Sequence, residues 1–192
     1  MRGSNKKLRI AYTSTCGHPQ ALIWLIALVT EPSIFTLEQA CSEIGIWDLE
    51  EGEIATKIFD KVFDTTLSAL EREILCNLWV FNEPIPPDVL MHFDQSLSLS
   101  KISRSINNLI NKAILNIYPN GAVSIDDLVH EYVTHYVQNK KQKHELAAQW
   151  YENRQNLPYE IWKSREDAHP TLRTVHHYIL ANHKCKLKQI AC

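Results

Sequence analysis

Apolar residues recur along most of this chain with the period of an α-helix. The first apolar run, 19–30, follows Gly17 and His18 and is apolar on nearly every side, which predicts a helix that is central or covered by another domain. Pro19 suits the first turn of that helix, where its missing N–H loses no hydrogen bond. A second helix is expected behind a capping box of Thr36 and Gln39. A third, over 49–63, completes a small helical subdomain.

Three helices are expected in quick succession between residues 65 and 113. The first follows a capping box formed by Ser68 and Glu71. Prolines then end it and start a short helix over 88–93. The third helix spans 98–113, because its apolar residues follow the 3.6-residue period closely. These residues are Ile102, Ile106, Leu109, Ile110 and Ala113.

A β-hairpin follows these helices. Residues 115–118 and 123–125 alternate apolar and polar side chains around Asn120-Gly121, the strongest short-range signal for a hairpin. Three helices followed by a two-stranded hairpin is the order of a winged-helix domain. The sequence therefore predicts a winged helix over 65–138.

Helical patterns continue to the end of the chain. Asp126 and Asp127 can cap a helix with apolar residues as far as Val137. The polar, basic stretch 139–143 is interpreted as a solvated linker before a helix over 144–154. From about Arg165 a last amphipathic helix is expected, whose apolar stripe is formed by Leu172, Val175, His176, Ile179 and Leu180.

The expected fold is mainly α, in three parts. A helical linker subdomain occupies 1–64, the winged-helix domain 65–138, and a tail of short α-solenoid-like helices 139–192. The chain has 192 residues, 45% of them apolar, and five glycines, a composition that argues against disorder and against a turn-rich β fold.

Charge and cysteine content narrow the function classes. The formal net charge is −2, whereas a free-standing nucleic-acid-binding domain is usually strongly basic. The five cysteines are widely spaced without a Cys-x-x-Cys pair, which favours a reduced, cytoplasmic protein. The longest apolar run, 21–29, is too short to span a bilayer, so no membrane partner is expected.

Four segments in order resemble the rear part of STAND/NB-ARC-type signal-transduction ATPases. They begin with Gly17-His18-Pro19-Gln20-Ala21-Leu22, similar to the Gly-x-Pro element of that family. The other three are 67–75 at the start of the winged helix, 129–133 after the wing, and 144–151 at the start of a helical repeat array. The resemblance implies a regulatory segment that begins where an ATPase module ends, and that is a fragment or a truncated product of a larger switch.

The resemblance also implies nucleotide-contacting residues. With the missing ATPase domain, Gly17, Pro19 and Asp126 would contact the nucleotide: Pro19 would lie against the adenine ring of ADP, and Asp126 stands where many family members carry a phosphate-sensing histidine. A carboxylate there would repel a diphosphate, which argues against direct phosphate sensing. Because the sequence lacks a Gly-x-x-x-x-Gly-Lys-Ser/Thr loop, we expect no catalysis and no cofactor in this chain unless a P-loop domain is joined to it.

The implied partners are a P-loop ATPase domain, in cis or in trans, and a protein bound by the C-terminal helices. The alternative is a DNA-binding winged-helix regulator that reads the major groove with helix 98–113. Its candidate contacts are Lys101, Arg104, Asn107, Asn108 and Lys112. The wing tip, 119–122, has no Lys or Arg for the DNA backbone, so packing between domains is the favoured use of this fold.

Metal chemistry is not expected. His130 and His135 are five residues apart around a His-Glu pair, whereas a helical zinc-protease motif requires a spacing of four to place both ligands on one face. The tail histidines and Cys185 are irregularly spaced. We therefore predict no metal site.

Overall fold

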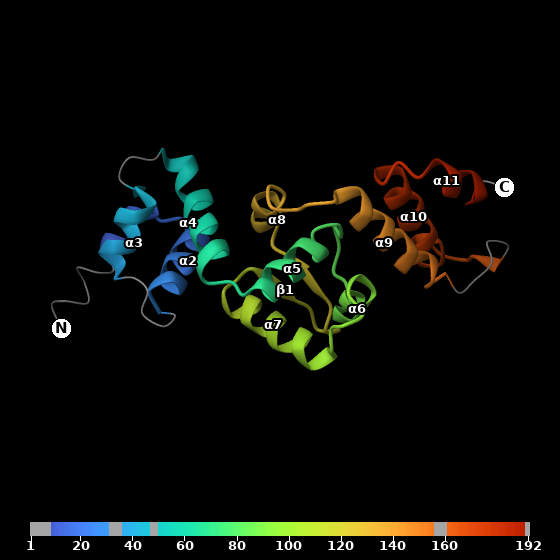
Figure 1. Cartoon of the computed structure of the whole chain (residues 1–192), viewed down its shortest axis with the longest axis horizontal. Helices are drawn as coiled ribbons and strands as arrows, with labels where there is room; N and C mark the ends of the chain where they lie inside the picture. Colours follow the sequence, from blue (N-terminus) through green and yellow to red (C-terminus); the bar gives the residue numbers. More distant parts are fainter. Residues whose placement is uncertain (1–8, 31–35, 47–49, 156–160, 191–192) are drawn as a thin grey trace. The chain divides into compact units, whose positions relative to one another are not determined.

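A computed structural model describes residues 9–30, 36–46, 50–155 and 161–190 (Figure 1). This part of the chain is mainly helical, with a small two-stranded antiparallel sheet. It divides into two compact units, each assembled from segments distant in sequence. The first unit contains 1–73, 104–116 and 125–132, and the second contains 74–103, 117–124 and 133–192.

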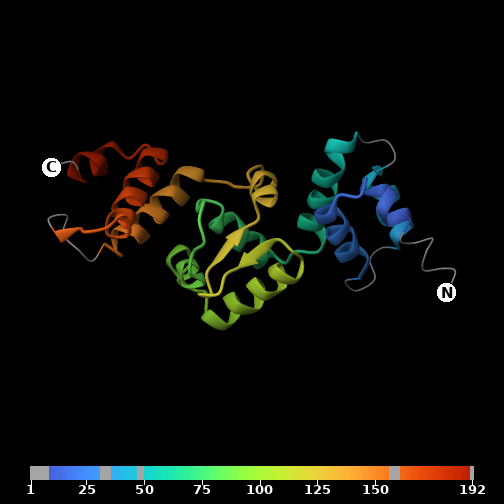
Figure 2. The ribbon, with the colours of Figure 1, turned by 180° about the vertical axis from the view of Figure 1, so that it is seen from behind.

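A helical segment over 9–14 opens the described part of the first unit, followed by α2 (Pro19–Thr30), α3 (Leu37–Ile44) and α4 (Glu51–Thr65). Helix α2 has the predicted bounds and packs against α4, as both views show (Figure 1, Figure 2). Trp24 of α2 is fully buried, and its ring lies 5.0 Å from that of Phe59 in α4. Large aromatic side chains of this kind bury the most apolar area in a small core.

The predicted caps of this region are confirmed. The amide of Gln39 donates to Thr36 Oγ1 at 3.2 Å, and the Thr36 amide donates to Gln39 Oε1 at 2.9 Å, so the capping box closes in both directions. Leu49, where the next helix was expected to begin, lies outside the described residues.

Helix α2, predicted to be central or covered by another domain, is buried on only part of its surface within this chain. Leu25 and Leu28 are buried with Trp24, but Ile23 and Ile26 are exposed. One apolar face of the helix therefore remains accessible to solvent in this chain.

The middle of the chain contains three helices, as predicted: α5 (Ala69–Leu78), α6 (Leu90–Phe93), preceded by the 3-10 turn η2 (Pro87–Val89), and α7 (Leu99–Asn111). Helix α7 ends two residues before the predicted boundary because Ala113 adopts a left-handed conformation, φ +52°. The Ala113 amide donates to Ile110 O and the Ile114 amide to Leu109 O, both at 2.9 Å. This is a Schellman ending with alanine in the place of the usual glycine.

The predicted hairpin is present as β1 (Leu115–Ile117) and β2 (Val123–Ile125). At its tip Gly121 has φ +78° and its amide donates to Tyr118 O at 2.9 Å. Sequence analysis missed a third participant. Ile85 exchanges two backbone hydrogen bonds of 2.9 Å with Val123, so the segment between α5 and α6 pairs with β2.

After the hairpin, the described residues contain α8 (Asp127–Val133), α9 (Lys140–Glu152), α10 (Arg165–Leu180) and α11 (Lys184–Ile190). The prediction that 139–143 is a linker was wrong, because α9 begins at Lys140. Its basic side chains have specific partners. Lys143 donates a hydrogen bond to Asn77 Oδ1, and Lys140 Nζ lies 5.2 Å from the ring centre of Trp79, a cation–π distance.

Helices α9 and α10 lie side by side (Figure 1, Figure 2). The bounds of α10 agree with the prediction, but the stripe expected to be its packing face does not pack. The buried residues of α10 are Thr174, His177 and Tyr178, whereas Leu172, Ile179 and Leu180 are exposed. The reason is long-range: α9 offers the aromatic and polar partners Tyr151, His144 and Glu152 to His177 and Tyr178.

Candidate functional site

The start of α2 is a tight turn that presents Pro19 to solvent. Gly17 has φ +74°, a conformation that favours glycine, and its amide donates to Tyr12 O at 3.0 Å. His18 then acts as the cap, since its Nδ1 accepts from the Ala21 amide at 3.3 Å. Pro19 is exposed in the first turn of the helix. The ring of Pro19 is therefore available to a group outside this chain.

The first turn of α2 contacts the junction between α7 and β1. Gln20 Nε2 donates a hydrogen bond to Ala113 O. The next residue, Ile114, accepts from the Asp126 amide through its carbonyl oxygen at 3.4 Å. The carbonyl groups of the consecutive residues Ala113 and Ile114 thus accept hydrogen bonds from Gln20 and from Asp126. These bonds connect Gln20, the residue after Pro19, and Asp126 to the same junction between α7 and β1.

Asp126 is half-buried and caps α8. Its Oδ1 accepts from the Leu128 amide at 3.1 Å, the local bond by which an aspartate satisfies a free amide at a helix start. One carboxylate oxygen is therefore occupied by the fold itself.

The predicted DNA-contacting residues of α7 divide into two groups. Lys101, Arg104 and Asn107 are exposed. Asn108 is exposed as well, but its side-chain amide donates to Glu71 Oε1 at 2.9 Å, and Lys112, beyond the helix, is only 8% exposed. The structure thus leaves Lys101, Arg104 and Asn107 open to a phosphate or a base, and Asn108 lies at the surface with a hydrogen bond already made.

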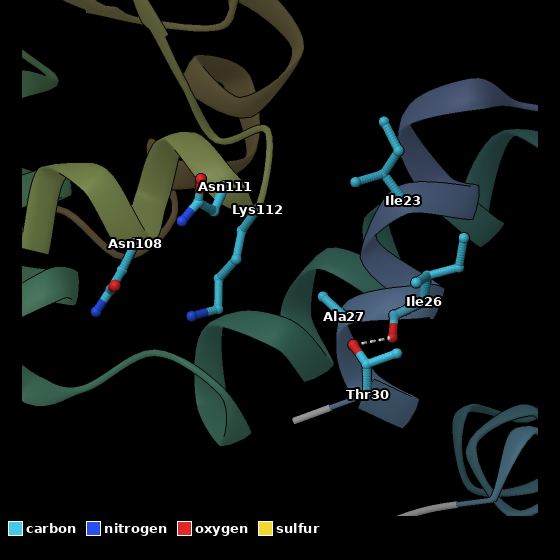
Figure 3. A pocket seen from close by; sticks show the side chains of 7 residues that line it. All are labelled: Ile23, Ile26, Ala27, Thr30, Asn108, Asn111 and Lys112. Atoms are coloured by element: carbon cyan, nitrogen blue, oxygen red, sulfur yellow. Dashed lines mark hydrogen bonds between the residues drawn. The ribbon is translucent and has the colours of Figure 1, made fainter. Parts of the chain in front are cut away.

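A pocket of about 230 Å³ lies between α2 and the end of α7 (Figure 3). On the α2 side it is lined by Ile23, Ile26, Ala27 and Thr30, and the Thr30 hydroxyl donates back to Ile26 O at 2.8 Å. On the other side lie Asn108, Asn111 and Lys112. One wall is therefore apolar and the other carries amides and an ammonium group.

A polar cluster that the sequence did not indicate surrounds Glu83. Tyr151 donates to the Glu83 carboxylate, and His169 Nε2 and Arg173 Nη2 lie 2.8 Å and 2.7 Å from its Oε2. Burial alone would raise the pKa of this carboxyl, but the hydrogen bonds from Tyr151 and His169 and the charge of Arg173 leave the pKa lower than usual. The three partners come from α9 and α10, so no local sequence pattern could have indicated the cluster.

A buried histidine pair lies beside this cluster. His144 Nδ1 and His177 Nδ1 are 3.1 Å apart, and the His177 ring stacks on Tyr151 at 5.5 Å. Burial, with the nearby His144, His176 and Arg173, lowers the pKa of His177 to about 3. Both rings are therefore neutral at physiological pH, and one Nδ1 donates its hydrogen to the other.

No group of three or more His, Cys, Asp or Glu among the described residues is arranged to hold a metal ion. No helix in the described ranges is long and apolar enough to cross a membrane.

Comparison with known proteins gave a likeness of fold. No family model matches the sequence, and no curated protein matches it. Among solved structures, the chain is similar to a signal transduction ATPase with numerous domains (STAND) that has a tetratricopeptide repeat sensor, from Pyrococcus horikoshii. The TM-score is 0.64 at 16% identity, over 94% of this chain and 22% of that protein. The chain therefore has a STAND-related fold and spans about a fifth of the length of that neighbour.

Proposed function

We propose that this chain is a regulatory segment of a STAND-type signalling ATPase, which couples the nucleotide state of a P-loop domain to the binding of a protein partner. The observation that supports it best is the likeness of fold to a STAND protein over 94% of the chain. The exposed Pro19 at the start of α2 agrees with this role, because a residue that borders a nucleotide must be open to the domain that holds it.

We propose further that the middle of the chain is a winged helix. Helices α5, α6 and α7 precede the hairpin in the order that this domain requires. The pairing of Ile85 with Val123 supports the proposal, since it adds a short strand between the first two helices and joins it to β2. Its role would be mechanical: to pack on the ATPase domain in one state and to leave it in the other.

The nucleotide would be held only together with the P-loop domain. Gly17 shapes the turn, Pro19 would contact the adenine, and Asp126 would lie near the phosphate end without donating to it. This chain supplies no catalytic group in the proposal, and ADP or ATP is its cofactor only in the assembled protein. The bonds from Gln20 to Ala113 and from Asp126 to Ile114 offer a route by which a change at Pro19 reaches the hairpin. Such a switch requires contacts that differ between its two states.

The test is nucleotide binding by this chain with and without a P-loop domain. A fluorescent ADP analogue should not bind the chain alone and should bind once the P-loop domain is supplied in trans or fused upstream. Pro19→Ala should weaken binding by the assembled protein several-fold, whereas the matched variant Pro119→Ala at the exposed hairpin tip should not. Tight ATP binding by the chain alone would refute the proposal.

DNA binding is the second candidate function, favoured by the exposure of Lys101, Arg104 and Asn107 on α7. A DNA reader should bind duplex DNA with an affinity that falls steeply with salt, because phosphate contacts release counterions. Arg104→Ala should then weaken binding and reduce the salt slope. If the affinity for DNA does not depend on salt and Arg104→Ala does not weaken binding, DNA binding is refuted and the proposed role in packing between domains remains.

A further inference from the structure

We propose that the cavity beside Glu83 binds an uncharged aromatic ring that carries one N–H or O–H donor, as in indole or phenol. We call this cavity the Glu83 pocket. It lies among the segment between α5 and α6, the end of α9 and the start of α10. The inference goes beyond the proposed function and does not depend on it. The apolar part of the pocket wall is formed by Pro84, Ile85, Pro86, Trp150, Tyr151 and Pro170.

The size of the Glu83 pocket suits a single ring system. Its volume is about 280 Å³, whereas pockets for drug-sized ligands measure roughly 300–1,000 Å³. One ring or two fused rings therefore match the space better than a nucleotide does.

The pocket offers proline rings to a ligand. Pro84 is exposed, and Pro86 and Pro170 are half-buried. The two aromatic residues of the wall are covered, since Trp150 is 9% and Tyr151 is 3% exposed. Prolines pack on aromatic rings, as when proline-rich peptides bind aromatic grooves, because the face of the ring is electron-rich. Here the prolines belong to the pocket, so the matching ligand is an aromatic ring.

A cationic ligand is disfavoured by the contacts of Arg154. The Cζ atom of Arg154 lies 4.2 Å from the ring centre of Trp150, a cation–π distance. This face of Trp150 is therefore already occupied, and the described wall offers no open aromatic cage of the kind that binds quaternary or methylated ammonium groups.

The charges at the pocket are also balanced within the described residues. Glu83 Oε2 lies 2.7 Å from Arg173 Nη2, and Arg154 Nη2 lies 3.2 Å from Asp88 Oδ2. A ligand with a net charge of either sign would have to compete with one of these pairs. The balance favours a neutral ligand.

The Glu83 carboxylate has one acceptor position left for such a ligand. Among the described residues, its Oε1 accepts from the Tyr151 hydroxyl, and its Oε2 lies within hydrogen-bond distance of His169 Nε2 and Arg173 Nη2. A carboxylate has about four acceptor positions. Glu83 lines the pocket, and its side chain is 17% exposed. The remaining position can therefore accept from a neutral N–H or O–H group.

The pocket wall is held in place before any ligand binds. Ile85 exchanges two backbone hydrogen bonds of 2.9 Å with Val123. Tyr151 is fixed by its hydrogen bond to Glu83 and by the His177 ring, which stacks on it at 5.5 Å. A preformed wall lowers the entropy cost of binding, so even a small ring can bind measurably.

Two pairs of small probes test the proposal by two-dimensional amide NMR titration of the whole chain. Indole should bind about fivefold more tightly than N-methylindole, which keeps the ring but lacks the donor. Phenol should bind about fivefold more tightly than cyclohexanol, which keeps the donor but lacks the aromatic face. The amide signals that shift should include those of Glu83, Ile85 and Tyr151, which line the pocket.

A double variant tests the proline wall. Pro84→Ala/Pro170→Ala removes two proline rings and should weaken indole binding at least fivefold. Pro170 lies inside α10, where alanine is the better helix former, so the helix is retained. Pro119→Ala, at the exposed hairpin tip, is the matched control and should bind indole as the wild type does. The signal dispersion of the same spectra shows whether each variant is folded.

A peptide distinguishes the two sources of such a ring. The blocked peptide acetyl-Gly-Gly-Trp-Gly-Gly-amide presents the indole group within a polypeptide. Tighter binding of this peptide than of indole would assign the pocket to a tryptophan of a partner protein. Tighter binding of free indole would assign it to a small molecule.

Any of three results would overturn the proposal. These are the absence of shifts at the pocket up to the solubility limit of indole, equal binding within either pair of probes, and indole binding unaffected by the double variant. Because the assay uses no nucleotide or P-loop domain, its failure is distinguishable from failure of the proposed ATPase role.

Discussion

Asn108 of α7 donates a hydrogen bond of 2.9 Å to Glu71 of α5, and Glu71 is buried, with a relative exposure of 4%. The second oxygen of the same carboxylate accepts from the Ser68 amide at 2.8 Å. One side chain therefore closes the capping box of α5 and connects it to α7. A buried polar group of this kind is costly to leave without its partner.

The Glu71–Asn108 pair should show strong energetic coupling. Glu71→Gln leaves one acceptor oxygen for two donors, so either the Ser68 amide or the Asn108 amide faces an NH2 group. Asn108→Asp sets two carboxylates against each other, and each change should lower the free energy of unfolding by about 1–3 kcal/mol. The double variant restores a donor opposite an acceptor and should recover part of that loss. Urea unfolding of the four proteins measures the coupling. Asn107→Asp, on the exposed neighbour, is the control, and a coupling near zero would contradict the interpretation.

The Glu83 cluster should matter more for stability than the surface ion pair near it. Glu83→Gln removes the charge that Arg173 faces at 2.7 Å in a site where Glu83 is 17% exposed, and should cost about 1–3 kcal/mol. Asp88→Asn removes the same charge from the exposed pair with Arg154, 3.2 Å apart, and should cost less than about 1 kcal/mol. Chemical unfolding at neutral pH compares them. Equal losses would show that burial of Glu83 does not strengthen its pairing.

Stability should fall as the pH decreases below about 6.5. In the fold the pKa of His177 is held near 3, chiefly by burial, whereas the unfolded chain protonates a histidine near 6.5. Between pH 3 and pH 6.5 the unfolded state therefore binds more protons than the folded state. The neutral ring stabilises the fold fully above pH 6.5, and this stabilisation is lost as the pH falls toward 3. The pKa of His144 is also lowered, by burial and by His176, so it acts in the same direction.

Unfolding free energies measured from pH 7.5 to pH 4.5 test this pH dependence. His177→Phe should flatten the decline by about one proton, roughly 1.4 kcal/mol per pH unit, while the exposed His176→Gln should leave most of it. A wild-type profile that is flat over this range would contradict the buried neutral pair.

Two left-handed positions near the start of α2 should respond oppositely to glycine and alanine. Gly17→Ala introduces a Cβ at φ +74° and should destabilise by about 1 kcal/mol. Ala113→Gly relaxes a residue at φ +52° and should be neutral to within about 0.5 kcal/mol, because the relief offsets the greater freedom of the unfolded chain. Thermal melts of both variants measure the two changes in stability. A larger loss of stability for Ala113→Gly than for Gly17→Ala would contradict this prediction.

Local signals were predictable from sequence, and partner-dependent ones were not. The bounds of α2 and the capping boxes at Thr36 and Ser68 depend on residues within a few positions, and they are confirmed. The face of α10 that packs was predicted wrongly, because His177 and Tyr178 find their partners on α9. The strand pairing of Ile85 was missed for the same reason, since its partner Val123 is 38 positions away.

The candidate site follows the same division. Gly17 and Pro19 could be named from a short motif, and the structure gives that motif the expected turn. The hydrogen bond from Gln20 to Ala113 joins residues 93 positions apart, so no spacing rule could have found it. Nothing in the pattern of α7 indicated that Asn108 is bound to Glu71, because Glu71 lies 37 positions away on α5.

The Glu83 carboxylate also bears on how this chain can be divided. Its three partners belong to the C-terminal helices, while Glu83 itself belongs to the segment between α5 and α6. Removing the residues after 138 would leave this carboxylate without Tyr151, His169 and Arg173, and would uncover the aromatic residues around it. The tail is therefore not an exchangeable module, and a shuffled or truncated descendant would have to replace Glu83 before it could lose α9, α10 and α11.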